Sequence, residues 1–100
     1  MIIELLPGYT KTTVKRAQKM LDIILYDSGK IGDREYDQCG EMGDGEDVGF
    51  LVMYTLVNNK IFFEMLPVRT QRYFGLDAWE NWKRDYMEKS TMQIKLEMDF

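Results

Sequence analysis

The chain has 100 residues, of which 45% are hydrophobic and 30% are charged, so its length suffices for one domain spanning 1–100. It contains no histidine and a single cysteine, Cys39, which excludes an internal disulfide, a histidine-based catalytic pair and a Cys/His zinc site. Seventeen acidic residues against 13 basic ones give a net charge of −4, which is not typical of a general nucleic-acid binder.

The composition also bears on location. No run of 18 apolar residues is present, so we expect no membrane span. The start, Met1-Ile2-Ile3-Glu4, has neither the basic region nor the long apolar stretch of a signal peptide. A free thiol without an export signal predicts a protein of the reducing cytoplasm.

The first two predicted elements are a short strand and a long helix. Residues 2–6 are mostly apolar and are followed by Pro7-Gly8, which indicates a strand that ends in a turn. Over residues 14–25 apolar side chains recur at spacings of three and four, which predicts an amphipathic helix. Ser28-Gly29 is expected to end this helix, and three threonines are candidates to cap its start: Thr10, Thr12 and Thr13.

The segment 30–47 is rich in acidic residues and glycines. Asp33 can cap a short helix that ends near Cys39, and the glycines that follow indicate a flexible acidic loop. The spacing of its acids does not match a calcium-binding loop, so we expect no metal. Such a carboxylate surface can instead dock on a basic partner and imitate a line of phosphates. Its acidic residues are Asp33, Glu35, Asp37, Glu41, Asp44, Glu46 and Asp47.

Residues 48–57 and 60–66 are rich in β-branched, aromatic and other large apolar side chains. Asn58-Asn59 between them can supply positive φ angles, so the pattern predicts a β-hairpin. The stretch 48–54 is also similar to the central strand of an RNA-recognition motif. It departs from that motif because Glu46 and Asp47 stand where a base and a glycine are expected, and because the first predicted strand has no stacking aromatic. We therefore interpret it as a core strand.

The last third of the chain predicts a helix and a strand. Residues 69–74 are interpreted as either an extension of the sheet or a loop. Asp77 and Glu80 have capping-box spacing and open a helix to about residue 89. This helix carries three large aromatic residues on one face: Trp79, Trp82 and Tyr86. Over residues 91–100 apolar and polar residues alternate without interruption, which predicts a half-buried strand.

The predicted order of elements is strand, helix, strand, strand, helix, strand. This is the order of the ferredoxin-like split unit, βαββαβ. We therefore predict an α+β fold with a single antiparallel sheet of about four strands. The two helices would cover one face of that sheet, and the other face would be exposed to solvent or covered by a partner.

The sequence offers no recognisable catalytic set. It has no phosphate-binding glycine loop, no dinucleotide fingerprint and no carboxylate pair that spacing alone assigns to a pocket, so we expect no enzyme and no cofactor. Its small, acidic character is similar to that of immunity proteins, antitoxins and phage-encoded inhibitors. This resemblance implies an inhibitor or adaptor whose acidic segment engages a basic surface, such as that of a nuclease or another nucleic-acid-binding complex. The expected hydrophobic anchors are Tyr73, Trp79 and Trp82.

Two other functions stay open. Bases of the first predicted helix and two later arginines can form a nucleic-acid-binding patch, although the net charge opposes it: Lys11, Lys15, Arg16, Lys19, Arg69 and Arg72. An open sheet face or the C-terminal edge strand can instead pair with another copy of the chain, which would give a homodimer or a larger homo-oligomer.

Overall fold

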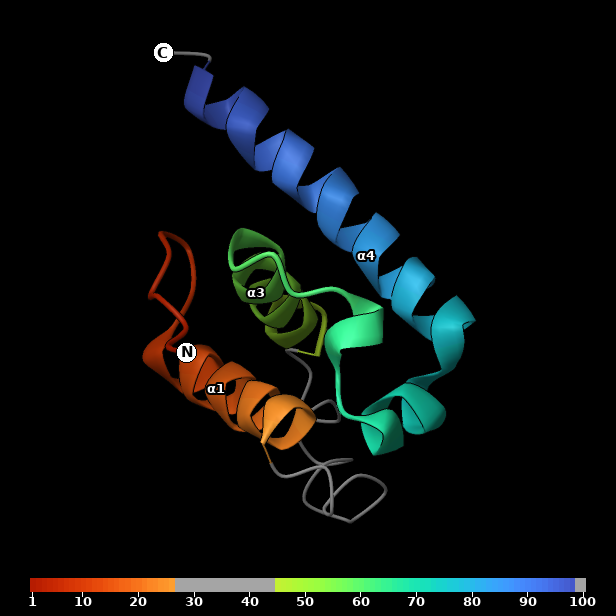
Figure 1. Ribbon diagram of the computed structural model, residues 1–100. Helices are drawn as coiled ribbons and strands as arrows, with labels where there is room; N and C mark the ends of the chain where they lie inside the picture. The colour runs from red at the N-terminus through yellow and green to blue at the C-terminus, as the bar shows by residue number, and fades with distance from the viewer. Residues whose placement is uncertain (27–44, 99–100) are drawn as a thin grey trace.

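The computed structural model describes residues 1–26 and 45–98, with side chains as far as Ser90, and every regular element in these residues is helical (Figure 1). The predicted α+β, ferredoxin-like fold is therefore wrong, because no strand is formed in the described part of the chain. The elements are α1 (Lys11–Leu25), α3 (Gly45–Asn58), the short 3-10 helix η2 (Phe63–Met65) and α4 (Val68–Met98).

The helix α1 confirms the predicted amphipathic helix. Thr10 caps its start, since its Oγ1 accepts a hydrogen bond from the backbone N–H of Thr13 at 3.2 Å. The buried stripe includes Ala17, Leu21 and Ile24, which face the core. The predicted stop at Ser28-Gly29 lies outside the described residues; the helix itself ends at Leu25.

Residues 1–9 form an irregular segment against α1, so the predicted strand over 2–6 is wrong. The side chain of Gln18 forms hydrogen bonds with the backbone of this segment, which in a sheet would come from a neighbouring strand. Its Oε1 accepts a hydrogen bond from the backbone N–H of Ile3 at 2.8 Å, and its Nε2 donates to the carbonyl of Met1 at 2.9 Å. Ile3 is buried, while Ile2 and Leu5 are exposed, so this apolar segment places only part of its side chains against the core.

The predicted hairpin is also wrong, because residues 48–57 belong to the central helix α3. This helix lies between α1 and α4 and packs against both (Figure 1). Eight of its residues are buried, so it has almost no polar face from which a helical period could be read. Its acidic first turn, which contains Glu46 and Asp47, suits the positive end of the helix dipole.

The predicted turn at Asn58-Asn59 is the end of α3. Lys60 has a φ of 56°, and the N–H of Ile61 donates to the carbonyl of Leu56 at 2.9 Å. The N–H of Lys60 donates to the carbonyl of Val57 at 3.0 Å, which completes a Schellman-type helix end. The chain then leaves through η2 and does not return as a strand.

The long helix α4 contains three separately predicted segments. Residues 69–74 form its first part, which ends in a kink at Gly75, where φ is 69° and ψ is 157°. Such a backbone conformation is essentially restricted to glycine. The helix predicted from Asp77 forms the second part, but it continues to Met98, so the strand predicted over 91–100 is wrong in its described residues. Thr70 ties the start of α4 to α1, since its hydroxyl donates to the carbonyl of Ile24 at 2.9 Å.

Candidate functional site

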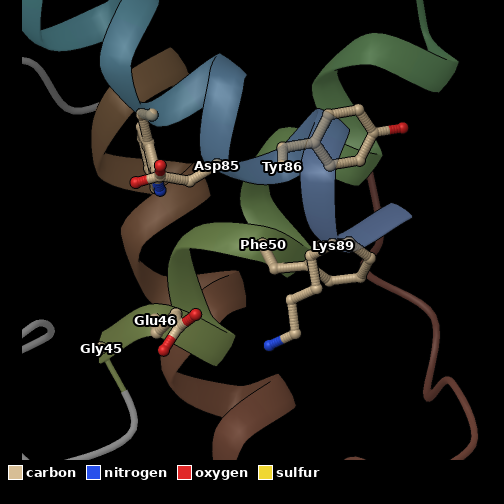
Figure 2. A pocket seen from close by; sticks show the side chains of 7 residues that line it. Gly45, Glu46, Phe50, Asp85, Tyr86 and Lys89 are labelled. Carbon is tan, nitrogen blue, oxygen red and sulfur yellow. The ribbon is translucent and has the colours of Figure 1, made fainter. Parts of the chain in front are cut away.

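A pocket of about 220 Å³ opens between the start of α3 and the middle of α4 (Figure 2). Aromatic rings from both helices form its apolar wall. Two carboxylates and one ammonium group supply its charges. The lining residues are Gly45, Glu46, Phe50, Trp82, Asp85, Tyr86 and Lys89.

Phe50 is the centre of the aromatic wall. Its ring stacks almost parallel to that of Tyr9, with 5.7 Å between centroids, and packs at 5.5 Å against Tyr86. The ring of Tyr54, one turn further along α3, has its centroid 5.9 Å from that of Phe50. Phe50 and Tyr86 are both buried, so rings from the N-terminal segment, α3 and α4 hold one another in place.

Trp82 completes the wall because residue 49 is a glycine. A Cβ on Gly49 would overlap the indole Nε1 of Trp82 and would lie only 2.8 Å from its Cε2. Trp82 is also held by Phe74, whose ring stacks with the indole at 5.9 Å between ring centroids. The close approach of α3 and α4 at Gly49 therefore places a half-buried indole in the pocket.

Lys89 connects α4 to the first turn of α3. Its Nζ lies 2.5 Å from Oδ1 of Asp47, and it stands over the rings of Tyr9 and Phe50 at 5.5 and 5.3 Å from their centroids. Burial alone would lower the pKa of Lys89, but the hydrogen bond and charge of Asp47, together with Tyr9, raise it above the ordinary value of 10.5. The ammonium is therefore charged near neutral pH and is already paired.

Removal of the Lys89 charge is expected to weaken the fold in a pH-dependent way. Lys89→Met should lower the free energy of unfolding by about 1 kcal/mol near neutral pH, because the ion pair and the ring contacts are lost. Since the pKa of Lys89 is raised by folding, this contribution is full below 10.5 and is lost as the pH rises through the folded-state pKa. Urea unfolding of both proteins across this range measures the difference, and an equal difference at every pH would contradict the role of the pair.

The two other carboxylates of the pocket are available to a ligand. Glu46 and Asp85 are exposed, and neither forms an ion pair or a side-chain hydrogen bond with another described residue. Figure 2 shows Glu46 on α3 and Asp85 on α4 at the rim of the same opening. The lining carries two carboxylates besides Lys89, whose charge is already paired with Asp47, so the site is acidic and suits a cationic group.

The pocket does not have the composition of a metal site. Among residues 1–26 and 45–98, no group of three or more acidic or cysteine side chains could hold a metal ion. The carboxylates of Glu46 and Asp85 belong to different helices and are combined with aromatic rings, which favour an organic cation over a hard metal ion.

The predicted site residues have different positions in the fold. Five of the acids lie outside the described residues: Asp33, Glu35, Asp37, Glu41 and Asp44. Glu46 and Trp82 line the pocket, and Asp47 pairs with Lys89 beside it. Trp79 is 3% exposed and packs against Phe63 in the core, whereas Tyr73 is 43% exposed and lies away from the pocket lining.

Sequence reasoning missed four residues of the site: Phe50, Asp85, Tyr86 and Lys89. Part of the signal was present. Positions 82, 85, 86 and 89 have the spacing of a single helical face, so this half of the pocket could have been read from the predicted second helix. The other half could not, because Glu46 and Phe50 share a face only if residues 45–50 are helical.

Comparison with protein-family models, with curated proteins and with solved structures finds no match for this chain. Among the described helices, none combines the length and the hydropathy that crossing a membrane requires.

Proposed function

We propose that this chain is a small, non-enzymatic protein-binding inhibitor or adaptor that engages a basic surface of another protein. The observation that carries the proposal is the acidic pocket between α3 and α4, with an aromatic wall and two carboxylates, Glu46 and Asp85, that no described residue neutralises. Opposite charge promotes encounter and selects the partner, while exposed ring surface adds contact area for a cationic side chain.

Two features support binding over catalysis. The pocket volume of about 220 Å³ is below the roughly 300–1,000 Å³ that is usual for small-molecule sites. In addition, the amine of Lys89 in its described lining is held as a charged ammonium by Asp47, so it is not an activated nucleophile.

The proposed mechanism is occlusion of a basic site on the partner. A nuclease or another nucleic-acid-binding complex presents lysines and arginines where phosphates bind, and carboxylates can occupy those places electrostatically. The predicted acidic segment 33–47 would extend this contact beyond the pocket. The proposal places the protein in the cytoplasm, where the thiol of Cys39 stays reduced.

Charge reversal at the pocket is expected to weaken partner binding strongly. The double variant Glu46→Lys/Asp85→Lys should bind its partner at least tenfold more weakly, because attraction becomes repulsion at the centre of the interface. Asp47 is left unchanged because its loss would unpair Lys89. The measurement is a pull-down from host lysate at low and moderate salt, followed by calorimetry with the retained protein.

The matched control is Glu64→Lys/Glu80→Lys, which makes the same change of charge at exposed positions outside the pocket. It should retain the basic partner as the unmodified chain does. Equal retention by the pocket variant would refute the proposal. Recovery of only the chain itself would replace it with self-assembly.

A second candidate function depends on α1. Lys11, Lys15 and Lys19 are exposed at four-residue spacing and therefore follow one face of the helix. Such a row can contact successive phosphates, so the chain could bind nucleic acid directly. Arg69 and Arg72, also part of the predicted patch, are exposed on the first part of α4. Salt-sensitive recovery of nucleic acid in the same pull-down would favour this candidate.

A further inference from the structure

We infer that the pocket between α3 and α4 receives a single arginine side chain of a partner protein. This inference rests on the proposed function and identifies the chemistry of the contact. It depends on three properties of the described residues: the charge of the rim, the rings of the wall and the size of the opening.

The charge of the rim selects a cation. Glu46 and Asp85 approach the opening from different helices, and both are exposed and unpaired among the described residues. Lys89 does not neutralise them, since its Nζ is held by Asp47 at 2.5 Å. A phosphate or carboxylate ligand would therefore meet net repulsion, and a cationic side chain would meet attraction.

The rings favour a guanidinium over an ammonium. The rings of Phe50 and Tyr9 are already occupied by Lys89, which stands over both. The half-buried indole of Trp82 stacks with Phe74 and also lines the pocket, and a flat cation can stack on an indole while its edge donates to nearby carboxylates. An ammonium has no flat face and is more strongly hydrated, so it gains less at such a site.

The volume of the pocket limits its occupant to one side chain. At about 220 Å³ the pocket is smaller than typical sites for drug-sized ligands, and it is open to solvent at the rim formed by Glu46 and Asp85. An extended side chain from a neighbouring protein surface can enter a pocket of this volume. The arginine would then act as a central anchor of the interface.

The test uses the intact chain, labelled with ¹⁵N and titrated with N-acetyl-arginine amide, N-acetyl-lysine amide and N-acetyl-citrulline amide. The chain has two tryptophans, whose indole N–H resonances report separately. The resonance of Trp82 should shift saturably with the arginine probe, while that of buried Trp79 should not. Citrulline has nearly the same shape without the charge and should give no saturable shift. Lysine should bind more weakly than arginine.

Removal of either rim carboxylate should weaken binding of the arginine probe. Glu46→Gln and Asp85→Asn are each expected to raise the Kd about threefold to tenfold, and the exposed control Glu80→Gln should leave it unchanged. Equal binding of citrulline and arginine, a common shift of both tryptophans, or no effect of either rim variant would overturn the inference.

Failure of this inference can be distinguished from failure of the proposed function, because the probe requires no partner. If the chain retains a basic protein but Trp82 does not respond to arginine, the pocket inference is wrong and the inhibitor or adaptor function stands. If Trp82 responds but no basic protein is retained, the pocket chemistry is correct and the proposed function is wrong.

Discussion

Replacement of Trp79 by alanine is expected to lower the free energy of unfolding by about 3–5 kcal/mol. The side chain is 3% exposed and its ring packs at 5.8 Å from that of Phe63, so truncation leaves a large cavity between α4 and the segment that contains η2. A loss of this size is a large share of the roughly 5–15 kcal/mol that stabilises a small domain. Urea unfolding followed by far-ultraviolet circular dichroism measures it.

Tyr73→Ala provides the matched control for Trp79→Ala. Tyr73 is also an aromatic residue of α4, but it is exposed, and its truncation is expected to cost less than about 1 kcal/mol. The pair of variants therefore separates a core role from a surface role for two residues that the sequence suggested as anchors. If Trp79→Ala lowered the free energy of unfolding no more than Tyr73→Ala does, Trp79 would not be a core residue.

A methyl group at residue 49 is expected to destabilise the protein by up to about 2 kcal/mol. In an ordinary helix, exchange of glycine for alanine gains about 1 kcal/mol. Here the new Cβ would overlap the indole of Trp82, and overpacking of this kind costs about 1–3 kcal/mol. We expect the overlap to prevail in Gly49→Ala, because the indole is also held by Phe74. Urea unfolding gives the free energy, and the Trp82 indole resonance reports its displacement.

A double-mutant cycle isolates the cause of the Gly49→Ala effect. Without the indole, in a Trp82→Ala background, the same substitution should be neutral or stabilising, because only the helix propensity remains. The change of sign between the two backgrounds is the expected result. Stabilisation in both backgrounds would show that α3 and α4 do not approach closely at Gly49, and the wall of the pocket would then need another description.

The helical parts with one polar face could be predicted from the sequence. Residues 14–25 alternate between buried and exposed positions at the helical period because α1 packs on α3 along one stripe. The cap at Thr10 follows from the same local chemistry. The helix predicted from Asp77 also exists, and Trp79 and Tyr86 are buried on its inner face as their spacing indicated.

The buried helix could not be predicted in this way. Residues 48–57 are apolar on nearly every side because α1 and α4 cover α3, and a short apolar run of this composition fits a buried strand equally well. The segment 2–6, an apolar run that ends at Pro7-Gly8, and the segment 91–98, which alternates, could be strands only beside other strands of the same sheet. A strand needs a neighbour for its backbone groups, and once 48–57 is helical no such neighbour exists among the described residues.

The candidate site also has one part that could be predicted from the sequence and one part that could not. The sequence by itself determined which acidic residues are available to the site and the common face of positions 82, 85, 86 and 89, because both depend only on residue type and local spacing. Only the tertiary structure decided that Glu46 and Phe50 lie opposite that face, that Lys89 is committed to Asp47, and that Trp79 is buried while Trp82 is partly exposed. The physical reason is that these relations join α3 to α4, and they depend on how closely two helices can approach across a glycine.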